Sequence, residues 1–131
     1  MKIVNKVTMF QMAVVDIDKS KEFYTDKLDF EVSKDIKRRG KRGVFLVPSD
    51  GGPSIILTTS NEKVKPGTMV IYLPTPNIEE TYNEMKERGI KLTSDIIADS
   101  EGTSFSFNDP DGNIWIVVLC RYGDVPPAIF Y

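Results

Sequence analysis

The side chains that most often carry catalysis are scarce in this chain. Its 131 residues include no histidine and a single cysteine, Cys120. Without histidine, the Ser-His-Asp and Cys-His arrangements of nucleophilic catalysis are excluded, and a zinc or iron site loses its commonest nitrogen ligand. Cys120 ends an apolar run, where a lone cysteine is typical of a small buried hydrophobe. The sequence therefore gives little support to nucleophilic catalysis.

The remaining polar candidates are one amide, two carboxylates and a basic run. Gln11 is the one uncharged amide within an apolar stretch from Lys6 to Val15, where it could bond to a neighbouring strand, to a second subunit or to a ligand. Asp109 and Asp111 belong to the run Asp-Pro-Asp-Gly-Asn, and we expect them to form its turn rather than to act as acid and base. The basic run 37–42 could attract an anionic ligand, although such runs are typical of a solvated hairpin.

Composition narrows the class of protein further. The length suits one domain, and 40% hydrophobic with 27% charged residues is ordinary for a soluble globular chain. A net charge of -2 makes no case for a nucleic acid or an anionic membrane as partner. No apolar run approaches the ~20 residues of a membrane span, and Gln11 and Asp16 interrupt any secretory apolar core. We therefore expect a cytoplasmic protein.

Hydrophobic periodicity predicts four strands and one helix in each half of the chain. In the first half, the helix covers about 18–28 after an N-cap at Asp16 or Asp18. In the second half, Asn77 and Glu80 form a capping box before a helix that ends near Gly89. The predicted strands lie at 6–15, 30–36, 44–47, 54–59, 68–73, 90–96, 103–107 and 114–119.

The order strand, helix, strand, strand, strand thus occurs twice. Asp50-Gly51 and Asp111-Gly112 occupy corresponding turns, which indicates two βαβββ modules within a single α+β domain, 1–131. Module one covers about 6–59, a polar linker 60–67, module two about 68–120 and a C-terminal tail 121–131. Because one helix leaves one face of each small sheet uncovered, two modules can bury part of that face against each other or across a dimer.

Three sequence motifs give this organisation a known counterpart. They are Val-Asp-Ile-Asp-Lys-Ser-Lys-Glu-Phe-Tyr at 15–24, Lys-Leu-Asp-Phe-Glu-Val at 27–32 and Asp-Pro-Asp-Gly-Asn at 109–113. In this order, over roughly 7–119, the chain resembles the vicinal-oxygen-chelate superfamily of glyoxalase I, bleomycin- and fosfomycin-resistance proteins and extradiol dioxygenases. Asp29 stands where that family mostly has glycine, and Asp tolerates the left-handed conformation better than most residues. The resemblance implies paired βαβββ modules whose mixed sheets form a cleft.

The resemblance also implies where a metal would bind. Its metalloenzymes hold one divalent ion through His, Gln or Glu side chains on the strands. Those positions fall here on Met9, Ile56, Thr68 or Val70, and Ile116, which cannot make a zinc, nickel, manganese or iron site of the usual kind. The resemblance therefore supports the fold, argues against the family's metal chemistry, and leads us to expect no cofactor.

A ligand site in the implied cleft would combine an apolar lining with a few polar groups. Trp115 lies on the opposite face of its strand from Ile116, so we expect it in the core, as we do Phe23, Tyr24 and Tyr82 on the helices. The predicted ligand-binding residues are Met9, Gln11, Ile56, Thr58, Thr68, Tyr72 and Ile116, of which Thr58 is the weaker candidate.

We expect a metal-independent protein that binds a small organic ligand, in the manner of bleomycin-resistance proteins that sequester a drug, and that forms a homodimer. An enzyme remains an alternative: a glyoxalase-type lyase or isomerase, or a dioxygenase, with non-standard metal ligands such as Gln11 with Glu31 or Glu101. A structural dimer module with a closed cleft is a second alternative. The apolar tail either frays or docks on a second subunit.

Overall fold

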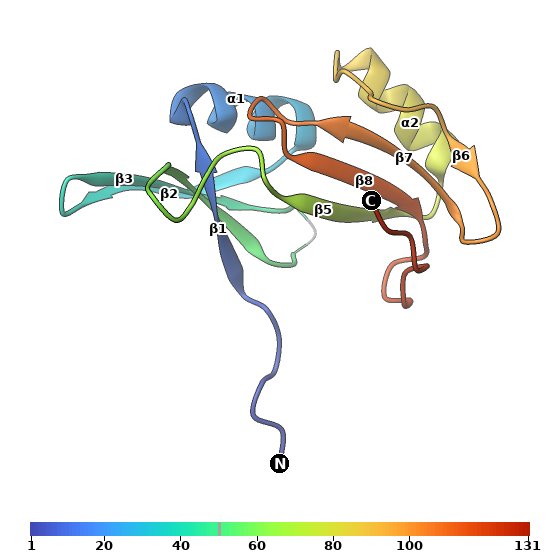
Figure 1. The fold of residues 1–131 in the computed structure, drawn as a ribbon, viewed down its shortest axis with the longest axis horizontal. Coiled ribbons are helices and arrows are strands. Elements are labelled where there is room, and N and C mark those ends of the chain that lie inside the picture. The colour runs from blue at the N-terminus through green and yellow to red at the C-terminus, as the bar shows by residue number, and fades with distance from the viewer. Residues whose placement is uncertain (50) are drawn as a thin grey trace. The chain divides into compact units, whose positions relative to one another are not determined.

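The computed structural model describes all residues of 1–131 except Asp50, so the predicted turn at Asp50-Gly51 lies partly outside the described residues. The chain forms two compact units, 1–66 and 67–131 (Figure 1). Neither of the helices in the described part of the chain is long and apolar enough to cross a membrane.

The first unit is a four-stranded sheet with one helix on one face (Figure 1). The strand order is β1-β4-β3-β2, in which β1 runs parallel to β4 and the other neighbours are antiparallel. Its elements are β1 (Met9–Val14), α1 (Ile17–Leu28), β2 (Glu31–Arg38), β3 (Lys41–Val47) and β4 (Ser54–Thr59).

Local sequence signals explain both ends of α1. The carboxylate of Asp16 caps the helix by accepting a hydrogen bond from the backbone N–H of Lys19. Asp29 ends the helix in the left-handed conformation, with φ of 60°, as its place in the motif predicted. Tyr24 is fully buried beneath the helix, and its hydroxyl lies 3.5 Å from the sulfur of Met12.

The second unit repeats this arrangement with the strand order β5-β8-β7-β6. The parallel pair is again formed by its first and last strands, so the prediction of an α+β fold built from two βαβββ modules is confirmed. Its elements are β5 (Val70–Thr75), α2 (Ile78–Glu87), β6 (Ile97–Ala98), β7 (Thr103–Asn108) and β8 (Ile114–Leu119).

The predicted strand at 90–96 is wrong. Leu92 makes only an isolated bridge to Phe107, and β6 is a two-residue strand farther along the chain. The hydroxyl of Thr93 lies 2.9 Å from the hydroxyl of Ser106, and the hydroxyl of Ser94 accepts a hydrogen bond from the Ser106 N–H. The Ser94 hydroxyl thus takes the Ser106 N–H in place of a backbone carbonyl of a regular ladder, and hydrophobic periodicity does not report such bonds.

The turn at 109–113 is organised by a buried carboxylate. Asp109, 6% exposed, accepts hydrogen bonds from the N–H groups of Asp111 and Asn113, from the Asn113 amide and from the indole of Trp115. Asn113 in turn accepts a hydrogen bond from the N–H of Met69. The predictions that Asp109 forms the turn and that Trp115 lies in the core are both confirmed, since Trp115 is 1% exposed.

Candidate functional site

The helix N-caps align the two units residue by residue. Asn77 caps α2 by accepting a hydrogen bond from the N–H of Glu80, as Asp16 caps α1. Met9 lies seven residues before its cap, and Val70 lies seven residues before Asn77. The counterpart of Met9 in the second unit is therefore Val70. Thr68 precedes β5, so no ladder pairing fixes the side to which its side chain points.

One face of the first sheet is left uncovered by α1. The helix packs on the face that carries Met12, so Met9 and Gln11 point to the other face. The parallel ladder places Gln11 beside Ile56, and the Gln11 amide donates a 3.1 Å hydrogen bond to the hydroxyl of Thr58. Four predicted ligand-binding residues therefore share one face of one sheet.

The same face extends across two further residues that sequence analysis missed. The β3–β4 pairing puts Phe45 beside Ile56, and the β2–β3 pairing puts Lys34 beside Phe45. The Lys34 ammonium lies 5.7 Å from the centre of the Phe45 ring, within cation–π range. The alternation of side chains along 41–47 could have indicated that Phe45 lies on this face. The position of Lys34 depends on a shift in strand register between Val32 and Lys34, which the sequence does not reveal.

In the second unit, α2 likewise covers one face of its sheet and leaves the other uncovered by a helix. Tyr82 packs edge-on against Phe105 at 5.2 Å between ring centres, which places Phe105 on the helix side. The other side carries a row in which Tyr72 and Ser106 flank Ile116. Tyr72 is 41% exposed, whereas Ile116 is 5% exposed, so the phenol of Tyr72 is the accessible group of this row.

The family's metal does not fit the residues at these positions. Met9 offers only a thioether, and Ile56, Val70 and Ile116 offer no donor atom. Among the described residues, no three His, Cys, Asp or Glu side chains gather as a possible metal site. The alternative pair of Gln11 and Glu31 lies on β1 and β2, the opposite edges of one sheet, which is about 14 Å across three strand spacings.

One residue of the basic run, Arg42, forms ion pairs on the helix side of the first sheet. The guanidinium of Arg42 donates two 2.8 Å hydrogen bonds to Asp35, and the Lys21 ammonium from α1 adds a third at 3.0 Å. These bonds, that of Arg42 first, hold the pKa of the Asp35 carboxyl well below its usual range. Arg42 also pairs with Asp18 at 2.9 Å. Arg42 is therefore committed to structural ion pairs.

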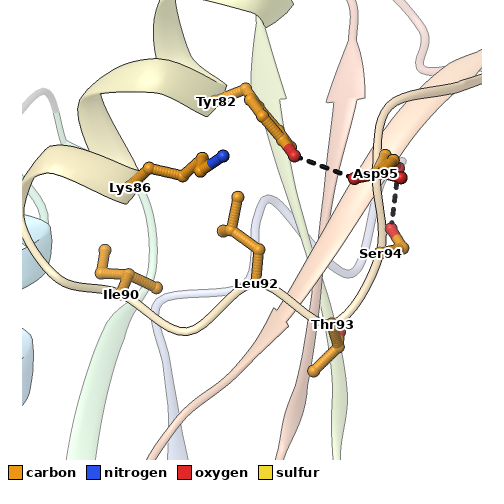
Figure 2. Close-up of a pocket in the computed structure, with 7 residues that line it drawn as sticks. All are labelled: Tyr82, Lys86, Ile90, Leu92, Thr93, Ser94 and Asp95. Atoms are coloured by element: carbon orange, nitrogen blue, oxygen red, sulfur yellow. Dashed lines mark hydrogen bonds between the residues drawn. The ribbon is translucent and has the colours of Figure 1, made fainter.

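A separate pocket of about 480 Å³ lies in the second unit, between α2 and the chain at 90–95. Figure 2 shows Tyr82 and Lys86 projecting from the helix toward this segment. It contains none of the predicted ligand-binding residues. Its lining consists of Tyr82, Lys86, Ile90, Leu92, Thr93, Ser94 and Asp95.

Comparisons with known proteins match this architecture. The family model described as Glyoxalase/Bleomycin resistance protein/Dioxygenase superfamily matches residues 6–117. The uncharacterized protein YurT of Bacillus subtilis (strain 168) is 28% identical over 124 residues, which cover 86% of this chain and 98% of YurT.

Two solved structures have the same fold. TnmS3, an antibiotic binding protein from Streptomyces sp. CB03234, matches with a TM-score of 0.80 at 24% identity, over 90% of this chain and 98% of TnmS3. A member of the same superfamily from Sphaerobacter thermophilus DSM 20745 matches with a TM-score of 0.78 at 29% identity, over 89% of this chain and 98% of its own.

Proposed function

The chain belongs to the Glyoxalase/Bleomycin resistance protein/Dioxygenase superfamily, and from this premise we propose that it binds a small organic molecule without the help of a metal ion. One observation carries the proposal. By the resemblance, the four positions where the superfamily's metalloenzymes place metal ligands fall on Met9, Ile56, Ile116 and Thr68 or Val70, of which the N-cap alignment favours Val70. Within each unit, these side chains suit the apolar wall of a ligand-binding face.

Polar groups on the same faces would orient the ligand. Gln11 and Thr58 form one hydrogen-bonded pair, and an amide that uses one N–H in such a bond keeps a second N–H and its carbonyl oxygen for a ligand. The phenol of Tyr72 combines a flat apolar ring with a hydrogen-bonding hydroxyl. Thr68 stays a candidate for a second polar contact near the start of β5. Binding by these groups needs no covalent step.

The proposed activity is capture of a drug or metabolite, as bleomycin-resistance proteins sequester theirs. TnmS3 is described as an antibiotic binding protein, and its shared fold supports the same kind of use here. We further propose that both units act as one domain in a cytoplasmic homodimer. Light scattering coupled to gel filtration tests the dimer, because a monomeric mass at micromolar protein would contradict it.

Binding at the proposed faces can be tested with 8-anilinonaphthalene-1-sulfonate, whose fluorescence rises on contact with apolar surface. We expect saturable binding that is unchanged by EDTA and weakened about tenfold by Ile56→Asp, because a carboxylate in the apolar row repels an anionic probe and resists desolvation. Thr59→Asp is the matched control, since Thr59 is the exposed last residue of β4. Binding that EDTA abolishes and zinc restores would instead support the metal-dependent enzyme.

A further inference from the structure

The pocket beside α2 belongs to the helix side of the second unit and is independent of the faces discussed above. Its volume of about 480 Å³ lies within the ~300–1,000 Å³ range of small-molecule sites. One wall is α2, which supplies Tyr82 and Lys86, and the other is the segment 90–95 (Figure 2).

Both walls are held in place before any ligand arrives. The Thr93 N–H donates a 2.8 Å hydrogen bond to the carbonyl oxygen of Ser106 in β7, and Leu92 forms a bridge to Phe107. On the helix side, the ring of Tyr82 is fixed against Phe105. A site built this way loses little conformational entropy when it binds.

The pocket is lined by one cationic side chain, Lys86, and one anionic side chain, Asp95. Both contact the uncharged Tyr82. The Lys86 ammonium lies 5.3 Å from the centre of the Tyr82 ring. The Tyr82 hydroxyl donates a 3.1 Å hydrogen bond to one carboxylate oxygen of Asp95, drawn as a dashed line in Figure 2. Within the part of the chain that the structure describes, no ion pair joins either charged group. Each group therefore keeps capacity for a charged partner.

An apolar side chain lies between the two charges. The half-buried Leu92 points into the space between Lys86 and Asp95 (Figure 2), and Ile90, 5% exposed, lines the pocket on the far side of Lys86. A ligand of a single charge would be attracted by one of these groups and repelled by the other. We propose that this pocket is a second binding site, and that it takes a small zwitterion of the amino-acid type with an aliphatic side chain.

In this assignment the ligand's ammonium group donates to the Asp95 carboxylate. Its carboxylate accepts from the Lys86 ammonium. The aliphatic side chain lies on Leu92. Charge-assisted hydrogen bonds at both ends give the site its selectivity for a molecule that carries both charges.

The test is a titration of ¹⁵N-labelled protein with L-leucine, followed by amide chemical shifts. We expect saturable shifts confined to residues 82–95 and their contacts in β7. Two analogues isolate the charges: 4-methylpentanoate lacks the ammonium group, and 3-methylbutylamine lacks the carboxylate. Each should bind at least tenfold more weakly than leucine. The proposal is overturned if leucine causes no saturable shift at 82–95, or if either analogue binds as tightly.

Three variants separate recognition from folding. Asp95→Asn keeps an acceptor for the Tyr82 hydroxyl while removing the charge, and Lys86→Met keeps the aliphatic stem. Both should weaken leucine binding about tenfold with the fingerprint spectrum of the rest of the unit unchanged. Lys91→Met, an exposed lysine outside the lining, should bind leucine like the parent protein. Equal affinity in all three variants would overturn the assignment.

Discussion

Tyr72 occupies in the second unit the place that Gln11 occupies in the first. Each lies five residues before the N-cap of its helix, and each is paired across the parallel ladder with an isoleucine, Ile56 for Gln11 and Ile116 for Tyr72. The duplicated fold therefore presents two equivalent positions with different chemistry, an amide in one unit and a phenol in the other.

The exposure of Tyr72 leads to a first prediction. Tyr72→Ala should weaken binding of the anilinonaphthalene probe by about threefold to tenfold, because the ring supplies accessible apolar area. The free energy of unfolding should fall by less than about 1 kcal/mol, because the side chain is 41% exposed. Tyr122→Ala, which removes a 68% exposed tyrosine of the tail, is the control and should bind normally. Equal loss in both variants would remove Tyr72 from the site.

The turn that marks the family predicts a large stability effect. Asp109→Ala should lower the free energy of unfolding by about 3 kcal/mol, since it leaves several buried N–H donors without their charged acceptor. Asp99 accepts hydrogen bonds from two backbone N–H groups in an exposed turn, and Asp99→Ala should cost about 1 kcal/mol. Urea unfolding measures both. A loss no greater than that of the control would contradict the role given to Asp109.

Two glycines with the same backbone conformation should respond differently to alanine. Gly40 and Gly67 have φ of 77° and 74°. A Cβ on Gly40 meets no atom within 4 Å, whereas one on Gly67 would overlap the carbonyl oxygen of Asp111. Gly40→Ala should cost about 1 kcal/mol for the left-handed conformation alone, and Gly67→Ala at least about 2 kcal/mol more. If thermal unfolding shows similar losses of stability for the two variants, the turn at 109–113 does not contact Gly67 closely enough to exclude a Cβ.

The ion pairs around Asp35 predict a pH dependence of stability. The pKa of this carboxyl is lowered from its ordinary value of 3.8 by hydrogen bonds from Arg42 and Lys21. The unfolded state therefore binds more protons below about pH 4, and the contribution of Asp35 is fully present above that pH and is lost as the pH falls toward the folded pKa. Asp35→Asn should be destabilised at pH 7, and its deficit should shrink in acid.

Salt and a second exposed pair provide the controls for this effect. Because Asp35 and Arg42 are partly exposed, the deficit of Asp35→Asn should be modest and should decrease in 1 M NaCl. Asp124→Asn, which breaks a more exposed pair with Arg121, should change the free energy of unfolding by less than about 0.5 kcal/mol. A deficit for Asp35→Asn that is independent of pH would contradict the ion-pair explanation.

Much of the fold could be predicted because local signals agree with one another. The caps at Asp16 and Asn77 and the left-handed exit at Asp29 each satisfy backbone groups within a few residues, so sequence reports them directly. Strands β4 and β8 were predicted with their observed bounds, because their apolar runs end at turn-forming residues.

What sequence missed depends on contacts between distant residues. The segment 90–96 has the apolar content of a strand, but its hydroxyl groups bond to Ser106 and leave most of it out of the ladder. Lys34 reaches the ring of Phe45 only because the register shifts in β2. The pocket beside Tyr82 likewise arises from packing of α2 over a segment whose path the sequence did not specify.

The most direct test of the central claim is the metal content of the protein purified from cells without chelators. Inductively coupled plasma mass spectrometry should find less than about 0.1 divalent ion per chain, because Met9, Ile56, Val70 and Ile116 supply no ligand set for one. The opposite result would be one zinc, nickel, manganese or iron ion per chain that stays bound through dialysis. It would contradict metal-independent binding and favour a metal-dependent enzyme.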